Sequence, residues 1–123
     1  SLASCTAQAD KLLANTKINF LSGSTELGSR SQRAINALAS ILSRCVRVGL
    51  AAELGGHTDN TGTGNYELSA ARAVAVSEAM IARGVPREAI SAVGFGPSKP
   101  IADNATEAGR AANRRTTVRW TQQ

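Results

Sequence analysis

GHTDNTGTGNYELSAARA, residues Gly56–Ala73, is the stretch of sequence that decides how this chain folds. The residues before it alternate between apolar and polar, as in a half-buried strand, and the residues after it contain no helix breaker as far as Arg83. A loop of Gly, Thr and Asn joins the two. We therefore expect a strand-to-helix junction, with Asp59 at the end of the strand and Arg72 near the start of the helix. In α/β folds, the crevice at such a junction is a common ligand site.

The rest of the chain divides into short segments with the periodicity of helices and strands. Ile18 and Phe20 alternate with polar residues and predict a first strand. Ser29 and Gln32 have the spacing of a capping box before a strongly amphipathic helix. Residues 94–100, GFGPSKP, are predicted to form a loop. In chain order, the expected elements are a helix at 5–14, a strand at 17–20, a helix at 29–45, a strand at 46–54, a helix at 65–83, a strand at 90–93, helical turns at 106–112 and a strand at 116–120.

This order of elements predicts a two-layer α/β sandwich with a β-α-β-α-β core, a mixed sheet and helices on one face. The crossover through the helix at 65–83 is expected to be right-handed. A chain of 123 residues is long enough to bury a core of its own, so we expect residues 1–123 to form a single domain that needs no metal or cofactor for its stability. No apolar run is long enough to cross a bilayer.

The net charge of +5 comes from eleven Arg and three Lys residues against nine acidic residues. Arginine recognises carboxylates and phosphates through its planar fork of N–H groups. For most of the arginines we expect a solvated basic surface. Arg72 and the pair Arg114 and Arg115 lie in contexts that suggest a binding role, and the pair either flanks a strand or reaches the junction.

Cys5 and Cys45 are the two cysteines of the chain. An even number without CxxC or His-rich spacing favours one disulfide over a zinc site, and a disulfide indicates an oxidising compartment. Closing this loop would stabilise the fold by about 4 kcal/mol. Two buried thiols in a cytosolic protein are the alternative. A lipoprotein cleavage box at residues 2–5 ranks last, because no apolar segment stands before it.

Asp59 and Arg72 allow two interpretations. In the first, Asp59 caps the loop and forms an ion pair with Arg72 that only neutralises the two charges. In the second, the two side chains form a clamp, in which the carboxylate binds an ammonium group and the guanidinium binds a carboxylate. The ligand of such a clamp carries both groups on one carbon atom, as a free amino-acid end does. Spacing alone does not decide between these interpretations.

His57 lies beside Thr58 and Asp59, but this cluster does not predict an enzyme. His57 is the only histidine, so a metal site lacks a second one, and neither Thr58 nor Thr61 has the setting of an activated nucleophile. We expect His57 to pack or to bond a loop. The glycines of the GTG and GFG segments are expected at turns with positive φ rather than at a phosphate site. The sequence thus predicts no catalytic residue, no metal and no cofactor.

Several motifs of the chain form a combined pattern. They are Gly56-His57-Thr58-Asp59, Gly62, Asn65-x-x-Leu68-Ser69-x-x-Arg72-Ala73 and Asn113-Arg114-Arg115. At these residues, the chain closely resembles the OmpA-like C-terminal domain, a peptidoglycan-binding family that includes the peptidoglycan-associated lipoprotein and the periplasmic part of MotB. Weaker similarity at residues 18–20, 94–96 and 100–104 extends the resemblance over most of the chain from Lys17 onward.

The resemblance implies non-catalytic binding of peptidoglycan through the meso-diaminopimelate of its stem peptide, whose side-chain end carries an ammonium and a carboxylate on one carbon atom. It implies that Asp59 holds the ammonium and that Arg72 holds the carboxylate. The further positions that it assigns to the site are Asn65 and Arg114 as polar contacts, Leu68 at the floor, the backbone of residues 22–24 along the rim, and Thr58 as a neighbour of Asp59.

One departure from the family pattern concerns the loop over the site. Two residues separate Gly62 from Asn65, where the family has about two more. The clamp pair is expected to remain, because strand and helix anchor its two ends. The shorter loop is expected to change what Asn65 and the loop backbone contribute to ligand binding.

The resemblance also implies a location in the periplasm or cell envelope, which agrees with a disulfide. We expect the chain to be part of a longer envelope protein associated with the outer membrane, in which this domain itself does not span the membrane. The sequence pI of about 10.0 suggests a nucleic-acid-binding domain as the alternative, and a cell-wall hydrolase is a third possibility. Scattered arginines without an aromatic stacking motif disfavour the former, and the lack of metal ligands and of a catalytic acid pair disfavours the latter.

Overall fold

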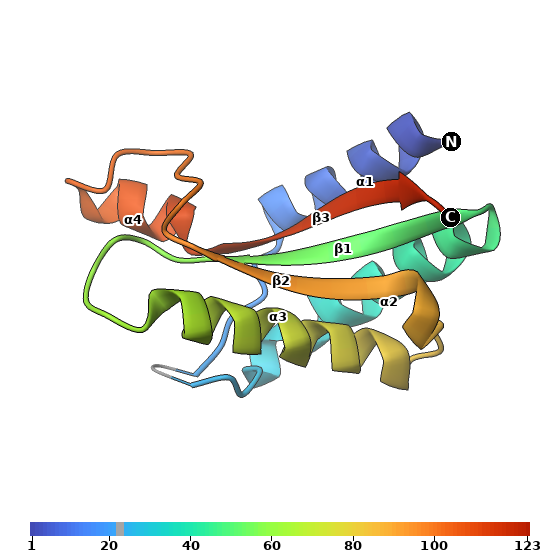
Figure 1. Cartoon of the computed structure of the whole chain (residues 1–123), viewed down its shortest axis with the longest axis horizontal. Helices are drawn as coiled ribbons and strands as arrows, with labels where there is room; N and C mark the ends of the chain where they lie inside the picture. The colour runs from blue at the N-terminus through green and yellow to red at the C-terminus, as the bar shows by residue number, and fades with distance from the viewer. Residues whose placement is uncertain (22–23) are drawn as a thin grey trace.

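Four α-helices, two short 3-10 turns and three strands make up the part of the chain that the structure describes, residues 1–21 and 24–123 of a computed structural model. The long helix after the Gly-rich loop and the short helix near the C-terminus begin and end within one residue of their predicted bounds. In chain order, the elements are α1 (Leu2–Asn15), η1 (Ser29–Ser31), α2 (Gln32–Arg47), β1 (Leu50–His57), α3 (Asn65–Ala82), η2 (Arg87–Ala89), β2 (Ile90–Gly96), α4 (Glu107–Asn113) and β3 (Arg115–Gln122) (Figure 1).

The three strands form one mixed sheet in the order β2-β1-β3. β1 pairs parallel with β2 and antiparallel with β3, so that Leu54 lies between Ala92 and Val118. Leu54 and Val118 belong to one hydrophobic core with residues of α1, α2 and α3. Glu53 turns to the opposite face of the sheet and forms an ion pair with Arg119. The predicted two-layer α/β fold with helices on one face is therefore confirmed.

The predicted first strand at 17–20 is wrong. Among the described residues, this segment forms only an isolated antiparallel bridge between Phe20 and Leu27. Its backbone finds partners outside a strand ladder: the Asn19 amide donates to the Ser31 hydroxyl at 2.6 Å, and that hydroxyl donates to the Asn19 carbonyl at 3.0 Å. A side chain of η1 thus satisfies the backbone groups that a neighbouring strand would otherwise pair.

The strand predicted at 46–54 begins four residues later. Val46 still belongs to α2 and packs against the core, whereas Val48, just beyond the helix, is 68% exposed. Gly49 turns the chain with a φ of 98°, and β1 starts at Leu50. Alternating apolar residues at the end of a helix imitate a strand, so periodicity alone places this boundary wrongly.

The predicted capping box of Ser29 and Gln32 does not form. Ser29 opens a 3-10 turn, and α2 begins only at Gln32. The Gln32 side chain accepts a hydrogen bond from Arg83 Nη2 at 3.0 Å instead of turning back to the helix start. A tertiary contact between α2 and the end of α3 replaces the local one.

Residues 94–96 belong to β2 and not to the predicted loop. The reason is the close approach of α3 to the sheet. A Cβ atom at Gly94 would lie 2.4 Å from the Ala70 amide nitrogen, and a Cβ atom at Gly56 would lie 2.2 Å from the Ser69 carbonyl oxygen. Glycine at both positions lets the first half of α3 rest directly on the ends of β1 and β2.

The predicted disulfide between Cys5 and Cys45 is confirmed, and it joins α1 to the C-terminal part of α2. Both cysteines are buried in the same core as Trp120 of β3. α1, which carries few large apolar residues, is thereby held on the helical layer.

In the ranges that the structure describes, no helix has the combination of length and apolar character that crossing a membrane requires.

Candidate functional site

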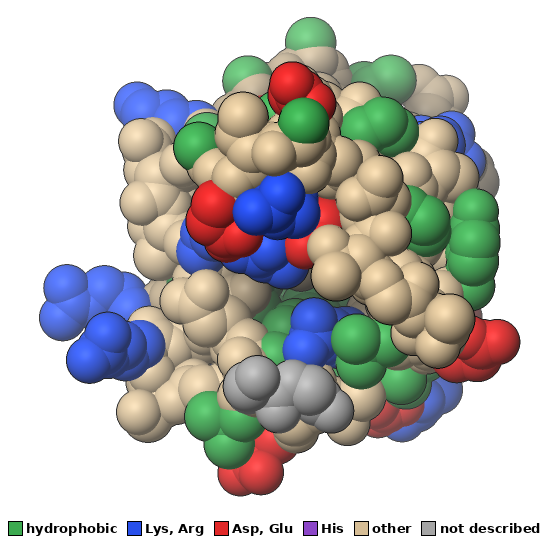
Figure 2. Space-filling model, turned by 90° about the vertical axis from the view of Figure 1, so that its left-hand side faces the viewer, with side chains coloured by type: hydrophobic (Ala, Val, Ile, Leu, Met, Phe, Trp, Pro, Cys, Tyr) green, Lys and Arg blue, Asp and Glu red, His purple; other side chains and the backbone are tan. Residues whose placement is uncertain are grey.

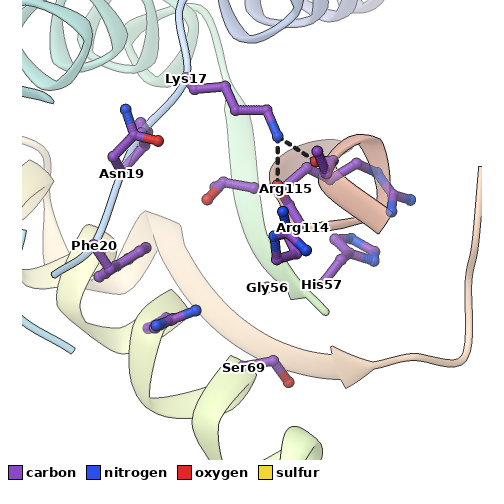
Figure 3. A pocket seen from close by; sticks show the side chains of 12 residues that line it. Lys17, Asn19, Phe20, Gly56, His57, Ser69, Arg114 and Arg115 are labelled. Atoms are coloured by element: carbon purple, nitrogen blue, oxygen red, sulfur yellow. Dashed lines mark hydrogen bonds between the residues drawn. The ribbon is translucent and has the colours of Figure 1, made fainter. Parts of the chain in front are cut away.

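A cavity of about 530 Å³ opens at the end of β1, between segment 17–20, the first half of α3 and the junction of α4 with β3. Figure 2 views the molecule from this end, and Lys and Arg side chains gather around the hollow. Four of the lining residues are basic and none of these described residues is acidic, so the cavity favours an anionic group of a ligand. The lining consists of Lys17, Ile18, Asn19, Phe20, Gly56, His57, Ser69, Arg72, Ala111, Arg114, Arg115 and Thr116 (Figure 3).

Arg72 brings one of these positive charges into the cavity from α3. Its Nε donates to the Ser24 carbonyl at 2.9 Å, and its guanidinium carbon lies 4.9 Å from the centre of the Phe20 ring. Burial lowers the pKa of Arg72, although a guanidinium stays charged in proteins. In the described part of the chain, Arg72 forms no ion pair, and its two terminal nitrogens have no hydrogen-bond partner. The Asp59–Arg72 pair of the first interpretation is therefore absent there.

Asp59 pairs with Arg114 instead. Its Oδ2 accepts a hydrogen bond from Arg114 Nη1 at 2.7 Å, and its Oδ1 accepts one from the Thr61 amide at 2.9 Å. Arg114 Nη2 donates to Glu107 at 2.7 Å. The Asp59 side chain is 12% exposed and that of Glu107 is 67% exposed, so Arg114 connects a buried acid with a solvated one. Asp59 does not line the cavity itself, but its partner Arg114 does.

Opposing effects determine the pKa of Asp59. Burial raises the pKa, whereas the hydrogen bonds from the Thr61 amide and from Arg114 lower it. The lowering effects outweigh the burial, and the pKa lies below its usual value. Asp59 is therefore an ionised carboxylate at neutral pH, and its charge is balanced by Arg114.

Lys17 closes one side of the cavity. Its ammonium donates to the carbonyls of Ala111 and Arg114, the latter at 2.8 Å, where the last turn of α4 leaves them without helical partners (Figure 3). Burial, followed by the positive charges of Arg114 and Arg115, lowers the pKa of Lys17. Three cations along one wall add to the preference of the cavity for an anion.

Thr58, Asn65 and Leu68 lie near the junction but do not line the cavity. Thr58 is buried, and its hydroxyl donates to the Asp59 carbonyl at 2.8 Å. The Asn65 side chain, in the first turn of α3, donates to the Thr61 carbonyl at 3.2 Å. Leu68 is half-buried one turn further along. The side chains of Thr58 and Asn65 thus hydrogen-bond to the loop that carries Asp59.

The rim that the resemblance assigns to residues 22–24 lies partly outside the described residues. Ser22 and Gly23 are not among them. Ser24 is, and its carbonyl accepts the hydrogen bond that orients Arg72. This backbone contact is consistent with a rim that passes over α3.

His57 packs against its neighbours, in line with the expectation from the sequence. Its Nε2 lies 2.8 Å from the Thr117 hydroxyl, and its ring stacks on Phe95 with a centroid distance of 5.1 Å. Burial, followed by the charges of Arg115 and Lys99, lowers the pKa of His57 to about 4. The imidazole is therefore neutral at neutral pH.

Lys17 and Phe20 are cavity residues that sequence reasoning missed. In the sequence they fit the pattern of a strand, which hides their role. Lys17 contacts Arg114 across 97 residues of chain, and Phe20 contacts Arg72 across a helix and a strand. No local signal identifies such contacts, because only the folded chain brings these segments together.

A sequence profile of the OmpA family matches residues 19–114. Outer membrane porin F from Pseudomonas aeruginosa is 36% identical over 114 residues, which cover 90% of this chain and 32% of the porin. Peptidoglycan-binding protein ArfA from Mycobacterium tuberculosis is 49% identical over 67 residues, which cover 53% of this chain and 21% of ArfA. The peptidoglycan-associated lipoprotein from Burkholderia pseudomallei has a crystal structure that matches with a TM-score of 0.74 at 29% identity, over 89% of this chain and 93% of that chain.

This chain spans less than a third of the length of porin F and of ArfA. Outer membrane porins and an outer-membrane lipoprotein are among its relatives, which confirms the predicted location in the cell envelope. The match to the lipoprotein structure agrees with the mixed sheet and helical layer described above. Because the profile match extends over most of the sequence, from residue 19 to residue 114, this chain belongs to the OmpA family.

Proposed function

We propose that this chain binds peptidoglycan without catalysis, through the meso-diaminopimelate of the stem peptide, and that it anchors an envelope protein to the cell wall. Residues 1–123 act as one binding domain in this proposal. Two relatives support the wall as the partner, since one is named a peptidoglycan-binding protein and the other a peptidoglycan-associated lipoprotein. The chemistry of the cavity supports the choice of ligand.

The proposal rests on the environment of Arg72. This guanidinium lies in a cavity, is oriented through its Nε by a backbone carbonyl, and has no ion-pair partner in the described residues. The N–H groups on its two terminal nitrogens match the two oxygens of a carboxylate. A ligand carboxylate would therefore find a preorganised fork, and its binding would neutralise a charge that burial destabilises.

Asp59 takes the ammonium of the ligand in this proposal. Arg114 supplies the positive charge at Asp59 Oδ2, at 2.7 Å. An ammonium that approaches from the cavity would share or replace this contact, while Glu107 retains Arg114 through its second terminal nitrogen. Thr58 and Asn65 hydrogen-bond to the loop that presents Asp59, and Arg114 adds a second cation near the ligand carboxylate.

The expected affinity for a single stem is low. Charge-assisted hydrogen bonds contribute roughly 1.5 to 3 kcal/mol each, and the entropy of association offsets much of that, which leaves a Kd on the order of micromolar to millimolar. Many stems are present in one wall, so several copies of the chain tether effectively even when each site is weak.

Sedimentation with purified peptidoglycan tests the proposal. We expect the chain to sediment with walls that contain diaminopimelate, and to remain soluble with walls whose stems carry lysine, which lacks the second carboxylate. Asp59→Ala and Arg72→Glu should each abolish sedimentation. Retention of binding in both variants would show that the ligand binds elsewhere.

The matched controls are Asp10→Ala and Arg33→Glu, which make the same changes of charge at exposed positions of α1 and α2. Both should sediment like the unmodified chain. Release of soluble muropeptides during the assay would contradict the non-catalytic part of the proposal. Circular dichroism of each variant separates loss of the site from loss of the fold.

A further inference from the structure

The outer surface of α2 concentrates positive charge at a distance from the cavity. The sequence of α2, QRAINALASILSRCVR, contains three arginines and no acidic residue. A groove of about 430 Å³ follows this surface, between α2 and the end of α3. We call it the α2 groove, and its polar lining consists of Asn36, Ser40, Ser43, Arg44, Arg47 and Arg83.

Neutral partners hold two of the three guanidinium groups of the α2 groove in place. Arg83 donates from Nε to the Asn36 side chain at 2.8 Å and from Nη2 to the Gln32 side chain at 3.0 Å. Arg44 donates from Nη2 to the Gln8 side chain of α1 at 2.9 Å. Amide oxygens orient these groups without neutralising them, so little side-chain entropy is left to lose when an anion binds.

The arginines of the α2 groove differ in this respect from four arginines elsewhere in the described part of the chain. Acidic side chains pair with Arg87, Arg110, Arg114 and Arg119. No ion pair within residues 1–21 and 24–123 includes Arg44, Arg47 or Arg83. Part of the excess positive charge of the chain, +5 overall, is therefore concentrated in the α2 groove without acidic partners among the described residues. The serine and asparagine side chains that line the groove can also donate hydrogen bonds to an anion.

The surroundings of the α2 groove indicate what kind of anion it meets. Val48 directly follows the helix and is 68% exposed, and Leu2 at the start of α1 is 43% exposed. The disulfide of Cys5 with Cys45 brings α1 to this same end of α2. Arginines beside exposed apolar side chains are typical of surfaces that lie in the headgroup region of a membrane.

The α2 groove and the cavity also lie toward different ends of the molecule. β1 begins at Leu50, shortly after α2 ends at Arg47, and the cavity lies where β1 ends at His57 (Figure 1). The eight residues of β1 separate these ends by roughly 23 Å. A ligand in the cavity therefore does not obstruct the C-terminal half of the α2 groove.

We propose that the α2 groove docks on the phosphate headgroups of an anionic phospholipid surface, with Arg44, Arg47 and Arg83 binding phosphates and Val48 entering the interface. This inference stands independently of peptidoglycan binding, because it uses different residues. It assigns the chain a membrane-facing end and a cavity-bearing end.

Flotation with lipid vesicles tests this inference on the chain as it stands. The unmodified chain should bind vesicles of phosphatidylcholine with added phosphatidylglycerol and should not bind phosphatidylcholine alone. Each arginine near such a surface contributes about a fivefold gain in binding, so the double variant Arg44→Gln/Arg47→Gln should bind about 30-fold more weakly. Its sedimentation with peptidoglycan should be unchanged.

The control is Arg87→Gln/Arg119→Gln, which removes the same charge outside the α2 groove. Undiminished vesicle binding by this control, together with loss in the groove variant, would support the proposal. Equal loss of vesicle binding in both double variants would mean that net charge alone causes the binding, and it would overturn the proposal. Binding of inorganic phosphate without binding of vesicles, detected by shifts of the α2 amide resonances, would also overturn the membrane assignment.

Discussion

The partner of Asp59 is decided at the scale of single residues by strand register rather than by sequence motif. In the motif, the nearest cation is Arg72, thirteen residues away. In the structure, the cation nearest to Asp59 is Arg114. β3 runs antiparallel to β1 and places Arg115 opposite His57, so the neighbouring Arg114 reaches the Asp59 carboxylate. Register thus brings a residue from the far end of the chain to the buried carboxylate. In the proposed function, Arg72 is the cation that remains for a ligand.

His57 is expected to make stability depend on pH. Its pKa is about 4 in the folded chain and 6.5 in its ordinary state, so between these values the unfolded chain binds more protons. The free energy of unfolding should therefore rise as pH increases from about 4 to 6.5 and stay level above that. The contribution amounts to at most about 3 kcal/mol. In His57→Gln this part of the pH dependence should disappear.

Urea unfolding of both proteins over this pH range measures the effect. Since His57 is the only histidine, the difference between the two curves isolates its titration from that of the carboxylates. Parallel curves for the two proteins would mean that the imidazole titrates equally in the folded and unfolded states.

At the scale of secondary-structure elements, the position of α3 on the sheet sets the geometry of the cavity. Gly56 and Gly94 give the helix backbone direct contact with β1 and β2. The Ser69 hydroxyl then accepts a hydrogen bond from the Gly96 amide at 2.9 Å and locks the helix to β2. Arg72, one turn later, points from this fixed helix into the cavity.

Gly94→Ala should therefore destabilise the fold and weaken the site. The added Cβ would lie 2.4 Å from the Ala70 amide nitrogen, so α3 must shift away from the sheet. Overpacking of this kind costs about 2–3 kcal/mol, which denaturant unfolding resolves. Gly28→Ala is the control, because its φ of −70° suits alanine and its Cβ would lie 3.5 Å from the nearest atom. Equal stability of both variants would argue against the close approach.

The short helix α4 depends on Asn113, which is fully buried. Its Oδ1 accepts hydrogen bonds from the amides of Ile101 and Ala102 at 2.7 and 3.0 Å, and its Nδ2 donates to Asn104 at 2.7 Å. This single side chain ties the loop after β2 to the helix that delivers Arg114.

Asn113→Ala should loosen that loop. Removing the carboxamide leaves the part-buried amides of Ile101 and Ala102 without this partner, which costs roughly 1–3 kcal/mol. Hydrogen exchange should accelerate at Ile101 and Ala102, while the amides of β1 keep their protection relative to global stability. Asn15→Ala, at an exposed position on α1, should leave this exchange unchanged. Unaltered protection of the loop in Asn113→Ala would contradict the assignment.

At the scale of the whole molecule, the disulfide ties a helix with few buried residues, α1, to the layer that covers the sheet. α1 contributes only Cys5 and Ala9 as fully buried residues, and it contacts α2 and β3. The cavity lies at the end of β1 and includes no residue of α1. Stability and binding are therefore expected to respond separately to the disulfide.

Reduction of the disulfide should lower the free energy of unfolding by about 4 kcal/mol, because it releases a loop that spans a sequence separation of 40 residues. Thermal unfolding with and without a thiol reductant measures this change. Cys5→Ala/Cys45→Ala should resemble the reduced chain and should not respond to the reductant. Peptidoglycan sedimentation of this variant, assayed well below its melting temperature, should persist. A shift with reductant in the double variant would mean that the reagent acts elsewhere.

The amino-acid sequence is sufficient to predict α3, α4, the three strands of the sheet, the cysteine pairing and membership of the family. Each of these depends on periodicity, on the spacing of motif residues such as Asp59 and Arg72, or on a count of cysteines, and such signals are contained in neighbouring residues. The basic character of the junction was also visible in this way.

Three features depend on the folded chain as a whole: Arg114 pairs with Asp59, segment 17–20 forms a wall of the cavity, and α2 ends beyond Val46. In each case, packing between groups far apart in sequence determines the outcome, through burial or through strand register. Hydrogen-bonding groups of a short segment pair wherever packing brings a partner, as the Asn19 backbone does with the Ser31 side chain. Local pattern cannot specify that partner, because the energy that selects it arises only when the whole chain packs.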